Sequence, residues 1–483
     1  MKVLFAVSEL APWVKTGGLG DVAAALPPAL EAAGAEVRVL VPRYPAFTAA
    51  FPEARYLAHF AGLGGQFPAA NLFEAQAPSG QTLWLIDCPP LFHRFGNPYH
   101  GPEGHDWLDN PLRFGLLSRI AARLASRASP LDWRPDILHC HDWQTGLAPY
   151  YLKSREGEGA ASVMTIHNLA FQGVFSRAVM EEIALGDEDW HIDGVEYYGH
   201  LSFLKAGLRH ADLITTVSPT YAREIQTDAE GMGMAGLLRL RADRLVGILN
   251  GIDTAVWNPA LDAHLAVRYD RDHLEAKAEN KRALQREMGL VERDDAPLFG
   301  IVSRLTYQKG LDLVAAIADA LVELPAQLAV LGSGEKPLEA AFRAAAARHP
   351  GQIAVKIGYD EPLAHRIEAG ADIFLMPSRF EPCGLNQMYS LAYGTPPLVR
   401  ATGGLADTVV NYSEAGLMEG SANGFVCEDA TPEAILGTLR WAASLWQDKP
   451  RWRQLQRNAM SRDFSWAGPA RQYLELYRRL RPQ

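Results

Sequence analysis

Short apolar runs and amphipathic stretches alternate along the whole of this chain. Each apolar run is short enough for a β-strand, and the stretches between many of them have the spacing of helices. Strands are expected at residues 2–8, 36–41, 82–87, 136–141, 161–166, 213–217 and 245–249, and again at 298–302, 327–331, 353–357, 372–376 and 396–399. Helices are expected at residues 20–33, 111–128, 202–210, 310–323, 336–347, 361–369, 384–393, 432–447 and 467–480. This order predicts an α/β protein with mostly parallel, doubly wound sheets.

The pattern occurs twice, once in each half of the chain. With 483 residues the chain is too long for one ordinary core, so more than one domain is expected. We place one Rossmann-like domain at residues 1–248 and a second at 249–466, with the boundary near Asn250-Gly251-Ile252-Asp253. The tail has helical apolar spacing and on its own reads as an ordinary terminal helix.

Composition excludes several classes of protein. Hydrophobic content of 48% and charged content of 21% are those of a globular protein, and a net charge of −10 argues against nonspecific nucleic-acid binding. The first apolar run is interrupted by Ser8 and Glu9, unlike a signal peptide, and no stretch is long enough to cross a bilayer. The four cysteines lack disulfide or metal spacing. We therefore expect a reduced, cytoplasmic protein with no membrane or nucleic-acid partner.

The loop Lys15-Thr16-Gly17-Gly18-Leu19-Gly20-Asp21 follows the first strand and precedes the first helix. Glycine backbone N–H groups, a helix N-terminus and the Lys15 ammonium together favour a phosphate ligand. The spacing matches neither the Walker loop nor the dinucleotide fingerprint. The alternative is a tight strand-to-helix turn with an incidental lysine.

Charged residues follow strands in the second half as well. Arg304 and Lys309 flank a strand-to-helix loop and would clamp a diphosphate, or else they are solvated surface charges. Glu381 precedes a helix at Gly384 and Leu385, whose amides would bind phosphate while the carboxylate positions a sugar; the alternative makes Glu381 part of a helix cap. Gly332-Ser333-Gly334 marks a loop that a ligand or other backbone can approach closely, and Gly403-Gly404 repeats the pattern of flexible backbone that a ligand can approach.

Histidines close two strands of the first half. Alternation puts His139 and His141 on one face, which makes a metal site one interpretation, although no second ligand cluster completes it. His167 and its neighbour Asn168 end the next strand, either facing a ligand or satisfied within the core. Asp187-Glu188-Asp189 has the form of a metal-binding Asp-x-Asp motif, but we interpret it as a solvated loop.

These blocks, in this order, closely resemble the bacterial glycogen synthases and plant starch synthases. The resemblance covers nearly the whole chain. It is carried by Lys15–Asp21, His141-Asp142-Trp143, Thr165-Ile166-His167-Asn168, Asn250-Gly251-Ile252-Asp253, Ser303-Arg304-Leu305, Gln308-Lys309-Gly310, Glu381-Pro382-Cys383-Gly384-Leu385 and Thr402-Gly403-Gly404-Leu405. One departure is Asn386, where the family usually has threonine, and we expect this change to affect donor contacts without changing the reaction.

The resemblance implies the GT-B architecture, with two Rossmann-like domains facing a central cleft and a C-terminal helix at 467–483 that returns to the first domain. The first domain would bind the acceptor and the second the nucleotide sugar. The implied reaction transfers glucose from ADP-glucose to the non-reducing 4-OH of an α-1,4-glucan such as glycogen, with retention and without a metal or other cofactor. Rival interpretations are a related GT-B enzyme that uses UDP-glucose or a small acceptor, and an inactive sugar-nucleotide or glucan-binding protein.

The resemblance also implies a set of site residues. The catalytic residues would be His167, Arg304, Lys309 and Glu381. The substrate-binding residues would be Lys15, Gly17, Gly18, Asp21, Asp142, Asn168, Asn250, Tyr359, Cys383, Gly384 and Leu385, with Tyr359 against the adenine. Closure of the two domains would bring these residues together and exclude water. The sequence leaves the oligomeric state open.

Overall fold

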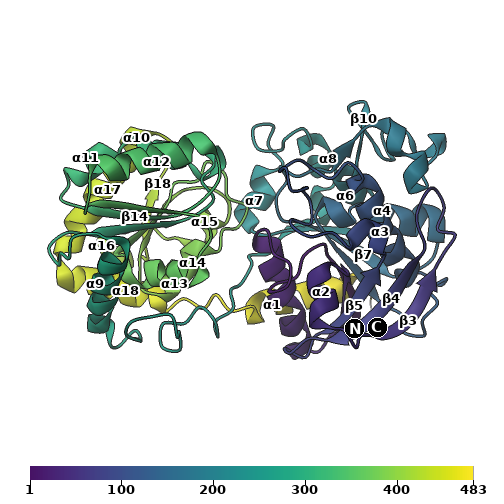
Figure 1. Cartoon of the computed structure of the whole chain (residues 1–483), viewed down its shortest axis with the longest axis horizontal. Helices are drawn as coiled ribbons and strands as arrows, with labels where there is room; N and C mark the ends of the chain where they lie inside the picture. Colours follow the sequence, from purple (N-terminus) through teal and green to yellow (C-terminus); the bar gives the residue numbers. More distant parts are fainter. Residues whose placement is uncertain (482–483) are drawn as a thin grey trace. The chain divides into compact units, whose positions relative to one another are not determined.

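Two parallel-stranded sheets organise the chain, which a computed structural model describes over residues 1–481 (Figure 1). One sheet belongs to an N-terminal domain made of Met1–Gly251 and the C-terminal segment from Trp466, and the other to a C-terminal domain, Ile252–Ser465. Both are Rossmann-like, as the strand–helix alternation predicts. The acceptor and nucleotide-sugar roles assigned to them stay predictions.

The N-terminal domain contains a nine-stranded sheet in the order β12-β11-β7-β6-β1-β2-β5-β4-β3. Its strands are β1 (Lys2–Ala6), β2 (Glu36–Pro42), β3 (Arg55–Phe60), β4 (Ala70–Gln76), β5 (Thr82–Asp87), β6 (Ile137–His141), β7 (Ala161–Ile166), β11 (Leu213–Thr216) and β12 (Leu245–Gly247). All pairings from β12 to β5 are parallel, and β4 and β3 add an antiparallel edge. A separate three-stranded sheet joins β8 (Val174–Phe175), β10 (His200–Ser202) and β9 (Glu196–Tyr197).

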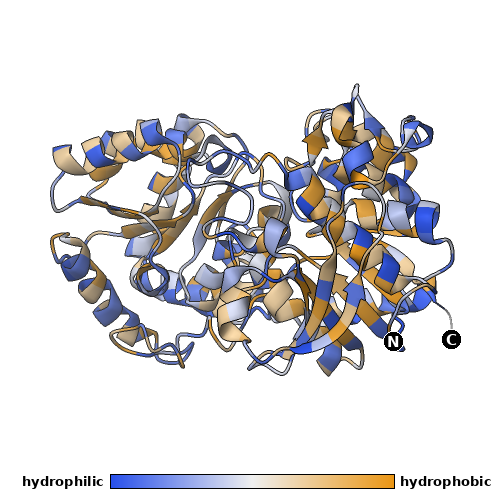
Figure 2. Ribbon diagram, turned by 45° about the vertical axis from the view of Figure 1, so that its right-hand side comes forward, coloured by the Kyte–Doolittle hydropathy of each residue, from blue (hydrophilic) through white to orange (hydrophobic). Residues whose placement is uncertain are grey.

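The C-terminal domain has a six-stranded, wholly parallel sheet in the order β15-β14-β13-β16-β17-β18. Its strands are β13 (Leu298–Val302), β14 (Gln327–Gly332), β15 (Ile353–Ile357), β16 (Ile373–Met376), β17 (Pro397–Arg400) and β18 (Phe425–Cys427). The central strands are apolar in both domains (Figure 2). Continuous burial of this kind is expected for parallel strands that helices cover on both faces.

Helices connect the strands and cover the sheets. The longer ones in the N-terminal domain are α1 (Gly18–Ala32), α4 (Asn110–Ala125), α6 (Phe203–His210) and α19 (Ala467–Leu480). Those of the C-terminal domain include α9 (Lys277–Met288), α10 (Leu311–Ala316), α11 (Ala318–Val322), α12 (Lys336–Arg348), α13 (Glu361–Gly370), α14 (Asn386–Ala392), α17 (Pro432–Gln447) and α18 (Lys449–Met460). Each of the nine helices expected from the sequence has a counterpart here, with ends that differ by up to three residues, and one of them is divided.

That divided helix is the one expected at residues 310–323. The prediction of a single helix is wrong, because α10 ends and α11 begins at Ile317, whose φ and ψ of −104° and 7° are not helical. The Ile317 N–H donates to the Val314 carbonyl at 3.1 Å, so the last turn of α10 tightens to the i→i−3 pattern. The edge strands β3 and β4 were also missed, because they mix buried and exposed residues and lack a continuous apolar run.

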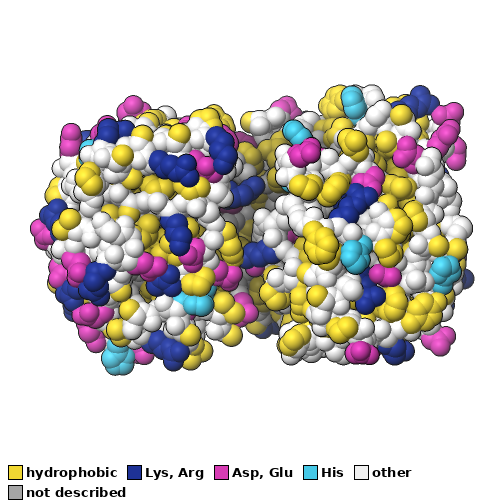
Figure 3. All heavy atoms as spheres, in the orientation of Figure 1, with side chains coloured by type: hydrophobic (Ala, Val, Ile, Leu, Met, Phe, Trp, Pro, Cys, Tyr) yellow, Lys and Arg dark blue, Asp and Glu magenta, His cyan; other side chains and the backbone are white. Residues whose placement is uncertain are grey.

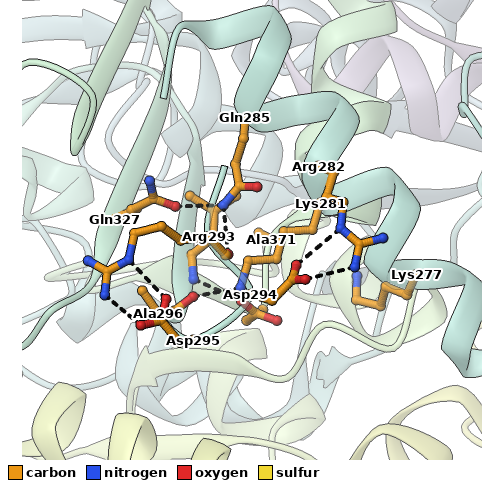
Figure 4. Close-up of polar contacts among 12 residues, drawn as sticks. Lys277, Lys281, Arg282, Gln285, Arg293, Asp294, Asp295, Ala296, Gln327 and Ala371 are labelled. Atoms are coloured by element: carbon orange, nitrogen blue, oxygen red, sulfur yellow. Dashed lines mark hydrogen bonds and ion pairs between the residues drawn. The ribbon is translucent and has the colours of Figure 1, made fainter. Parts of the chain in front are cut away.

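A polar helix that the sequence did not predict, α9, docks through buried side chains (Figure 4). Lys281 Nζ donates to the Ala296 carbonyl at 2.6 Å and pairs with Asp372 at 2.7 Å. One turn on, Gln285 Nε2 donates to Gln327 Oε1 at 2.8 Å. One turn before, Lys277 Nζ donates to the Ala369 carbonyl at 2.5 Å and the Thr395 hydroxyl at 2.6 Å, and burial lowers its pKa to about 7. This spacing places one polar face of α9 against the strand N-termini.

The C-terminal helix α19 packs against α1 and is bonded to the core of the N-terminal domain. Its Tyr477 hydroxyl lies 2.7 Å from His139 Nδ1, and the other ring nitrogen of His139 lies 2.6 Å from Thr165 Oγ1. All three side chains are fully buried. The hydrogen bond from Tyr477 therefore connects α19 to β6 in the middle of the sheet.

The surface of each domain, on the face seen in Figure 3, carries basic and acidic side chains interspersed. Within residues 1–481, no helix is long and apolar enough to cross a membrane. The four cysteines are free and buried, as their scattered positions suggest. The cytoplasmic location stays a prediction.

We expect Tyr477→Phe to lower the free energy of unfolding by about 1–3 kcal/mol, because it leaves His139 Nδ1 buried without a partner. Urea denaturation followed by circular dichroism measures this change. Tyr56→Phe is the matched control, since Tyr56 is 54% exposed and its loss of a hydroxyl should change stability little. Equal stabilities of the two variants would contradict a stabilising role for the Tyr477 hydroxyl.

Candidate functional site

Each main sheet has a switch point, where neighbouring strands continue the chain in opposite directions, and several predicted site residues lie there. In the N-terminal domain β1 lies between β2 and β6, so the connections after β1 and β6 leave on opposite sides. In the C-terminal domain β13 and β16 stand in the same relation. Open α/β sheets bind ligands at the carboxyl ends of strands at such a switch point. The Lys15 loop follows β1, His141 ends β6, Arg304 follows β13, and Glu381 follows β16.

The Lys15 loop is held by two carboxylates. Lys15 Nζ pairs with Asp21 at 2.7 Å, and both side chains remain about one-third exposed. Ion pairs this exposed contribute little to stability, so the ammonium can be redirected to an anionic ligand at small cost. Asp21, predicted as a substrate-binding residue, is therefore the group that positions Lys15.

The second carboxylate, Glu9, was missed by the sequence analysis as a site residue. It is buried and accepts hydrogen bonds from the Thr16 N–H and the Thr16 hydroxyl, each at 2.6 Å. The Tyr99 hydroxyl also donates to Glu9. Glu9 could have been chosen as a candidate because it is a polar residue that follows β1. Its partner Tyr99 could not have been predicted, because it lies far along the chain. These bonds use the N–H and the hydroxyl of Thr16, and binding of a ligand by Lys15, Gly17 and Gly18 stays a prediction.

Gly17 has no need to be glycine for packing. Its φ of −165° is extended backbone that any residue adopts, and a Cβ built there meets no atom within 4 Å. It immediately precedes α1, and no side chain caps the start of that helix. The free N–H groups of α1 and the open space beside Gly17 fit an anionic ligand that approaches the backbone closely.

Asp142 sits in an unusual conformation after β6. Its φ is 54°, and its Oδ1 accepts the backbone N–H of His167 at 2.7 Å and that of Asn168 at 3.4 Å. The side chain of Asn168 accepts the N–H of Ala170, which shapes the turn after β7. Burial raises the pKa of Asp142 to about 7, against the lowering effect of the two backbone hydrogen bonds. Asp142 thus positions the backbone of His167 and Asn168, besides any contact with substrate.

The side chain of His167 is paired with another histidine. Its Nε2 lies 2.9 Å from Nδ1 of His141, and burial lowers the pKa of His167 to about 3, so its ring is neutral at physiological pH. His139 and His141 do share a face, with ring centroids 4.1 Å apart. Among residues 1–481 no three His, Cys, Asp or Glu side chains are grouped so as to hold a metal ion. His139 instead bonds two hydroxyl groups.

In the C-terminal domain the predicted catalytic cation and carboxylate form an ion pair. Lys309 Nζ lies 2.6 Å from Glu381 Oε2, which also accepts the Ser378 hydroxyl at 3.0 Å. Both charged side chains are mostly buried, so each restricts the position of the other. Arg304 follows β13 and is exposed, and no ion pair to it is found in the part of the chain that the structure describes. It is the cation of this group that is available to an added anion.

The loop that carries Glu381 rests against a pair of glycines. Gly403 has a φ of +45°, and a Cβ there would lie 1.9 Å from the Glu381 carbonyl oxygen. The N–H of Gly404 donates to the Glu381 and Pro382 carbonyls at 3.2 and 3.1 Å. Gly403 and Gly404 therefore pack against the backbone of the Glu381 loop, and their approach by a ligand stays a prediction.

The same loop leads into α14. The helix begins at Asn386, after Leu385, and within the described chain no backbone carbonyl accepts from the amides of Gly384 or Leu385. The Asn386 side chain donates to the Val302 carbonyl at 2.6 Å, joining α14 to the end of β13. Asn386 therefore contacts the protein backbone two residues before Arg304. Cys383 is buried in this loop.

The remaining predicted residues lie apart from these pairs. Tyr359 follows β15, and its side chain is 75% exposed with its hydroxyl donating to Glu361 at 2.6 Å. An exposed ring held at one end is suited to stacking on a base, which stays a prediction. Asn250 is buried at the end of the N-terminal domain.

The interpretation of Asp187–Asp189 as a solvated loop is wrong for Asp189. Its carboxylate is buried and accepts from the Tyr150 hydroxyl, from the Gly186 N–H at 2.7 Å, and from Arg155. Asp187 pairs with Arg177 at the surface. These bonds make Asp189 a structural carboxylate. The sequence motif could not reveal this role, because Arg155 and Tyr150 lie far from Asp189 in the sequence.

Two Rossmann-like domains with cations, a carboxylate and a histidine at their switch points constitute the architecture of the GT-B glycosyltransferases. Comparison with known proteins agrees. The family described as "Starch synthase catalytic domain" matches residues 2–240, and "Glycosyl transferases group 1" matches residues 287–460.

The relatives extend over the full chain. The glycogen synthase of Dechloromonas aromatica is 59% identical over 478 residues, covering 99% of this chain and 98% of its own, and that of Nitrosospira multiformis is 55% identical, covering 99% and 97%. The catalytic domain of starch synthase IV from Arabidopsis thaliana, solved bound to ADP and acarbose, is 33% identical, with a TM-score of 0.87 and 99% of each chain covered. This protein belongs to the glycogen and starch synthase family.

A more distant structure shows how widely the fold is shared. The sucrose-phosphate synthase of Thermosynechococcus elongatus is 18% identical with a TM-score of 0.59, covering 99% of this chain and 98% of its own. At this identity the likeness shows the fold alone.

We expect Asp142→Asn to change the pH dependence of stability. The pKa of Asp142 is raised from an ordinary value of about 3.9 in the unfolded chain to about 7, so the folded state holds its proton more tightly. The stability that this group contributes is therefore complete below about pH 4 and is lost as the pH rises towards 7.

The asparagine amide oxygen can accept the same two N–H groups without ionising. The free energy of unfolding of the variant, relative to the native protein, should thus increase between about pH 4 and pH 7. Urea denaturation at a series of pH values measures it. A difference that stays constant over this range would show that Asp142 does not titrate as described.

Proposed function

We propose that this protein transfers glucose from ADP-glucose to the non-reducing 4-OH of an α-1,4-glucan in glycogen synthesis, with retention at the anomeric carbon. The observation that carries the proposal is the Lys309–Glu381 pair beside an exposed Arg304 at the switch point of a GT-B domain. Full-length similarity to glycogen synthases supports the reaction, and the ADP bound to the starch synthase IV relative supports the nucleotide.

The chemistry breaks the bond between glucose C1 and the diphosphate oxygen, and it forms a bond between C1 and the acceptor O4. Negative charge develops on the leaving diphosphate, and preorganised cations stabilise such charge most effectively. Arg304 would supply a planar guanidinium to two oxygens, and Lys309 has N–H donors beyond the one directed at Glu381. The amides of Gly384 and Leu385 would add uncharged donors.

Glu381 would accept hydrogen bonds from sugar hydroxyls with the oxygen that Lys309 and Ser378 do not occupy. In the N-terminal domain the His167 carbonyl would stabilise positive charge on the sugar ring, and its imidazole would bond a sugar oxygen. The proton of the acceptor 4-OH would pass to the leaving phosphate on the same face. The alternative is a covalent glucosyl intermediate on a carboxylate.

The Lys15 loop, Gly17, Gly18 and the helix start that follows them are proposed as an anion-binding element of the N-terminal domain. Asp142, Asn168 and Asn250 are proposed as further polar contacts to substrate, and Tyr359 and Cys383 as contacts in the C-terminal domain.

Donor choice tests the proposed function directly. We expect ADP release from ADP-glucose in the presence of glycogen to exceed UDP release from UDP-glucose, with little release in the absence of glycogen. Preference for UDP-glucose would favour the related GT-B enzyme, and donor binding without release would favour an inactive binding protein. Activity should persist in excess EDTA, whereas a loss that Mg²⁺ restores would overturn the metal-free reaction.

Arg304→Ala should lower kcat by about 10²-fold or more, because it removes the available cation beside the leaving group. Initial rates of ADP release at saturating ADP-glucose measure this effect. Arg343→Ala is the control, since Arg343 is an exposed arginine on α12 of the same domain. If Arg304→Ala turned over like Arg343→Ala, then Arg304 would have no part in the chemistry.

A further inference from the structure

The ring of His141 packs against two other rings and is hydrogen-bonded at only one nitrogen. Phe5 and His139 lie against it with ring centroids 4.0 and 4.1 Å away. Its Nδ1 faces His167 Nε2 at 2.9 Å, whereas its own Nε2 is buried with no hydrogen-bond partner within residues 1–481. Burial, reinforced by the neighbouring His139 and His167, holds the pKa of His141 well below its usual range, so the ring is neutral.

A neutral imidazole carries one proton, so the pair has two possible arrangements. If His167 donated from Nε2, then His141 would accept at Nδ1 and carry its own proton on Nε2. That arrangement would bury an N–H donor with no partner. If His141 donates from Nδ1, its Nε2 is a bare lone pair. Buried N–H groups without a partner are rarer in proteins than unfilled acceptors, so the second arrangement is favoured.

The state of His167 follows from that of His141. Because His167 accepts at Nε2, its single proton lies on Nδ1. That nitrogen makes no hydrogen bond to any described residue, and it is absent from the buried polar atoms that lack a partner. It is therefore the nitrogen that a ligand meets, and it meets the ligand as an N–H donor.

We propose that His141 is a positioning residue that fixes the tautomer and orientation of His167, so that His167 presents Nδ1–H to an oxygen of the bound sugar. This inference rests on the proposed function for its consequence in catalysis, but the tautomer is a property of the free protein. In this tautomer His167 acts as a hydrogen-bond donor, and its protonated Nδ1 cannot act as a general base. No proton moves to or from His167 during transfer.

Nitrogen NMR of the ligand-free protein tests the tautomer without any reaction. With ¹⁵N-histidine labelling and the His167 signals assigned by their loss in His167→Ala, Nδ1 should resonate as a protonated, pyrrole-type nitrogen and Nε2 as a pyridine-type nitrogen. His141 should show a protonated Nδ1 as well. The reverse pattern at His167, with the proton on Nε2, would overturn the proposal.

Variants of His141 then connect the tautomer to the rate. His141→Phe keeps an aromatic ring against Phe5 and His139 but removes the donor, so His167 should populate both tautomers. The value of kcat should then fall about 10- to 100-fold, as when other orienting partners are lost. The KM for ADP-glucose should change less than kcat. His141→Asn places an amide N–H near the position of Nδ1, and it should restore the native tautomer and much of the rate.

The control is His139→Gln, two residues earlier on the same face of β6, which has no hydrogen bond to His167. It should alter the melting temperature but leave the His167 signals in place. Native tautomer and native kcat in His141→Phe would overturn the positioning role. If instead the native protein had the expected tautomer but no transfer activity with either donor, then the proposed function would fail while the assignment of His167 stood.

Discussion

The reversal of strand order at β1 and β6, and again at β13 and β16, is the constraint on which the rest of each domain depends. Right-handed connections leave on opposite faces on the two sides of such a reversal, so the loops after those strands diverge. Polar side chains in these loops can therefore be partly buried and still face a ligand. The ion pair of Lys309 with Glu381 and the contact of His141 with His167 both occur there.

The candidate site residues of the two domains are held in different ways. In the N-terminal domain the buried His139 and His141 and the partly buried His167 remain neutral, because desolvation outweighs any gain from charge. The hydroxyl groups of Thr165 and Tyr477 form hydrogen bonds with the two ring nitrogens of His139. Helix α19, which carries Tyr477, therefore contributes a hydrogen bond to a residue of β6. In the C-terminal domain the mostly buried side chain of Lys309 pairs with the buried carboxylate of Glu381.

Much of the fold could be predicted because its signals are local. Apolar runs such as Val3–Val7 predict buried parallel strands, and glycine or proline occurs at many boundaries of helices and strands. The strands β3 and β4 could not be predicted in this way because their residues mix buried and exposed positions. The polar helix α9 could not be predicted because its buried side chains bond to residues outside the helix. The break between α10 and α11 could not be predicted either, because no proline or glycine lies at Ile317.

The same distinction applies to the candidate site. The sequence alone determined which chemical groups end the strands, because strand ends and motifs are read from neighbouring residues: Lys15, His167, Arg304, Lys309 and Glu381. Only the tertiary structure decided how these groups are paired. Glu9 meets Tyr99 across 90 residues, and Lys309 meets Glu381 across 72. Such pairings depend on strand order, and strand order is set by packing of the whole sheet rather than by any local pattern.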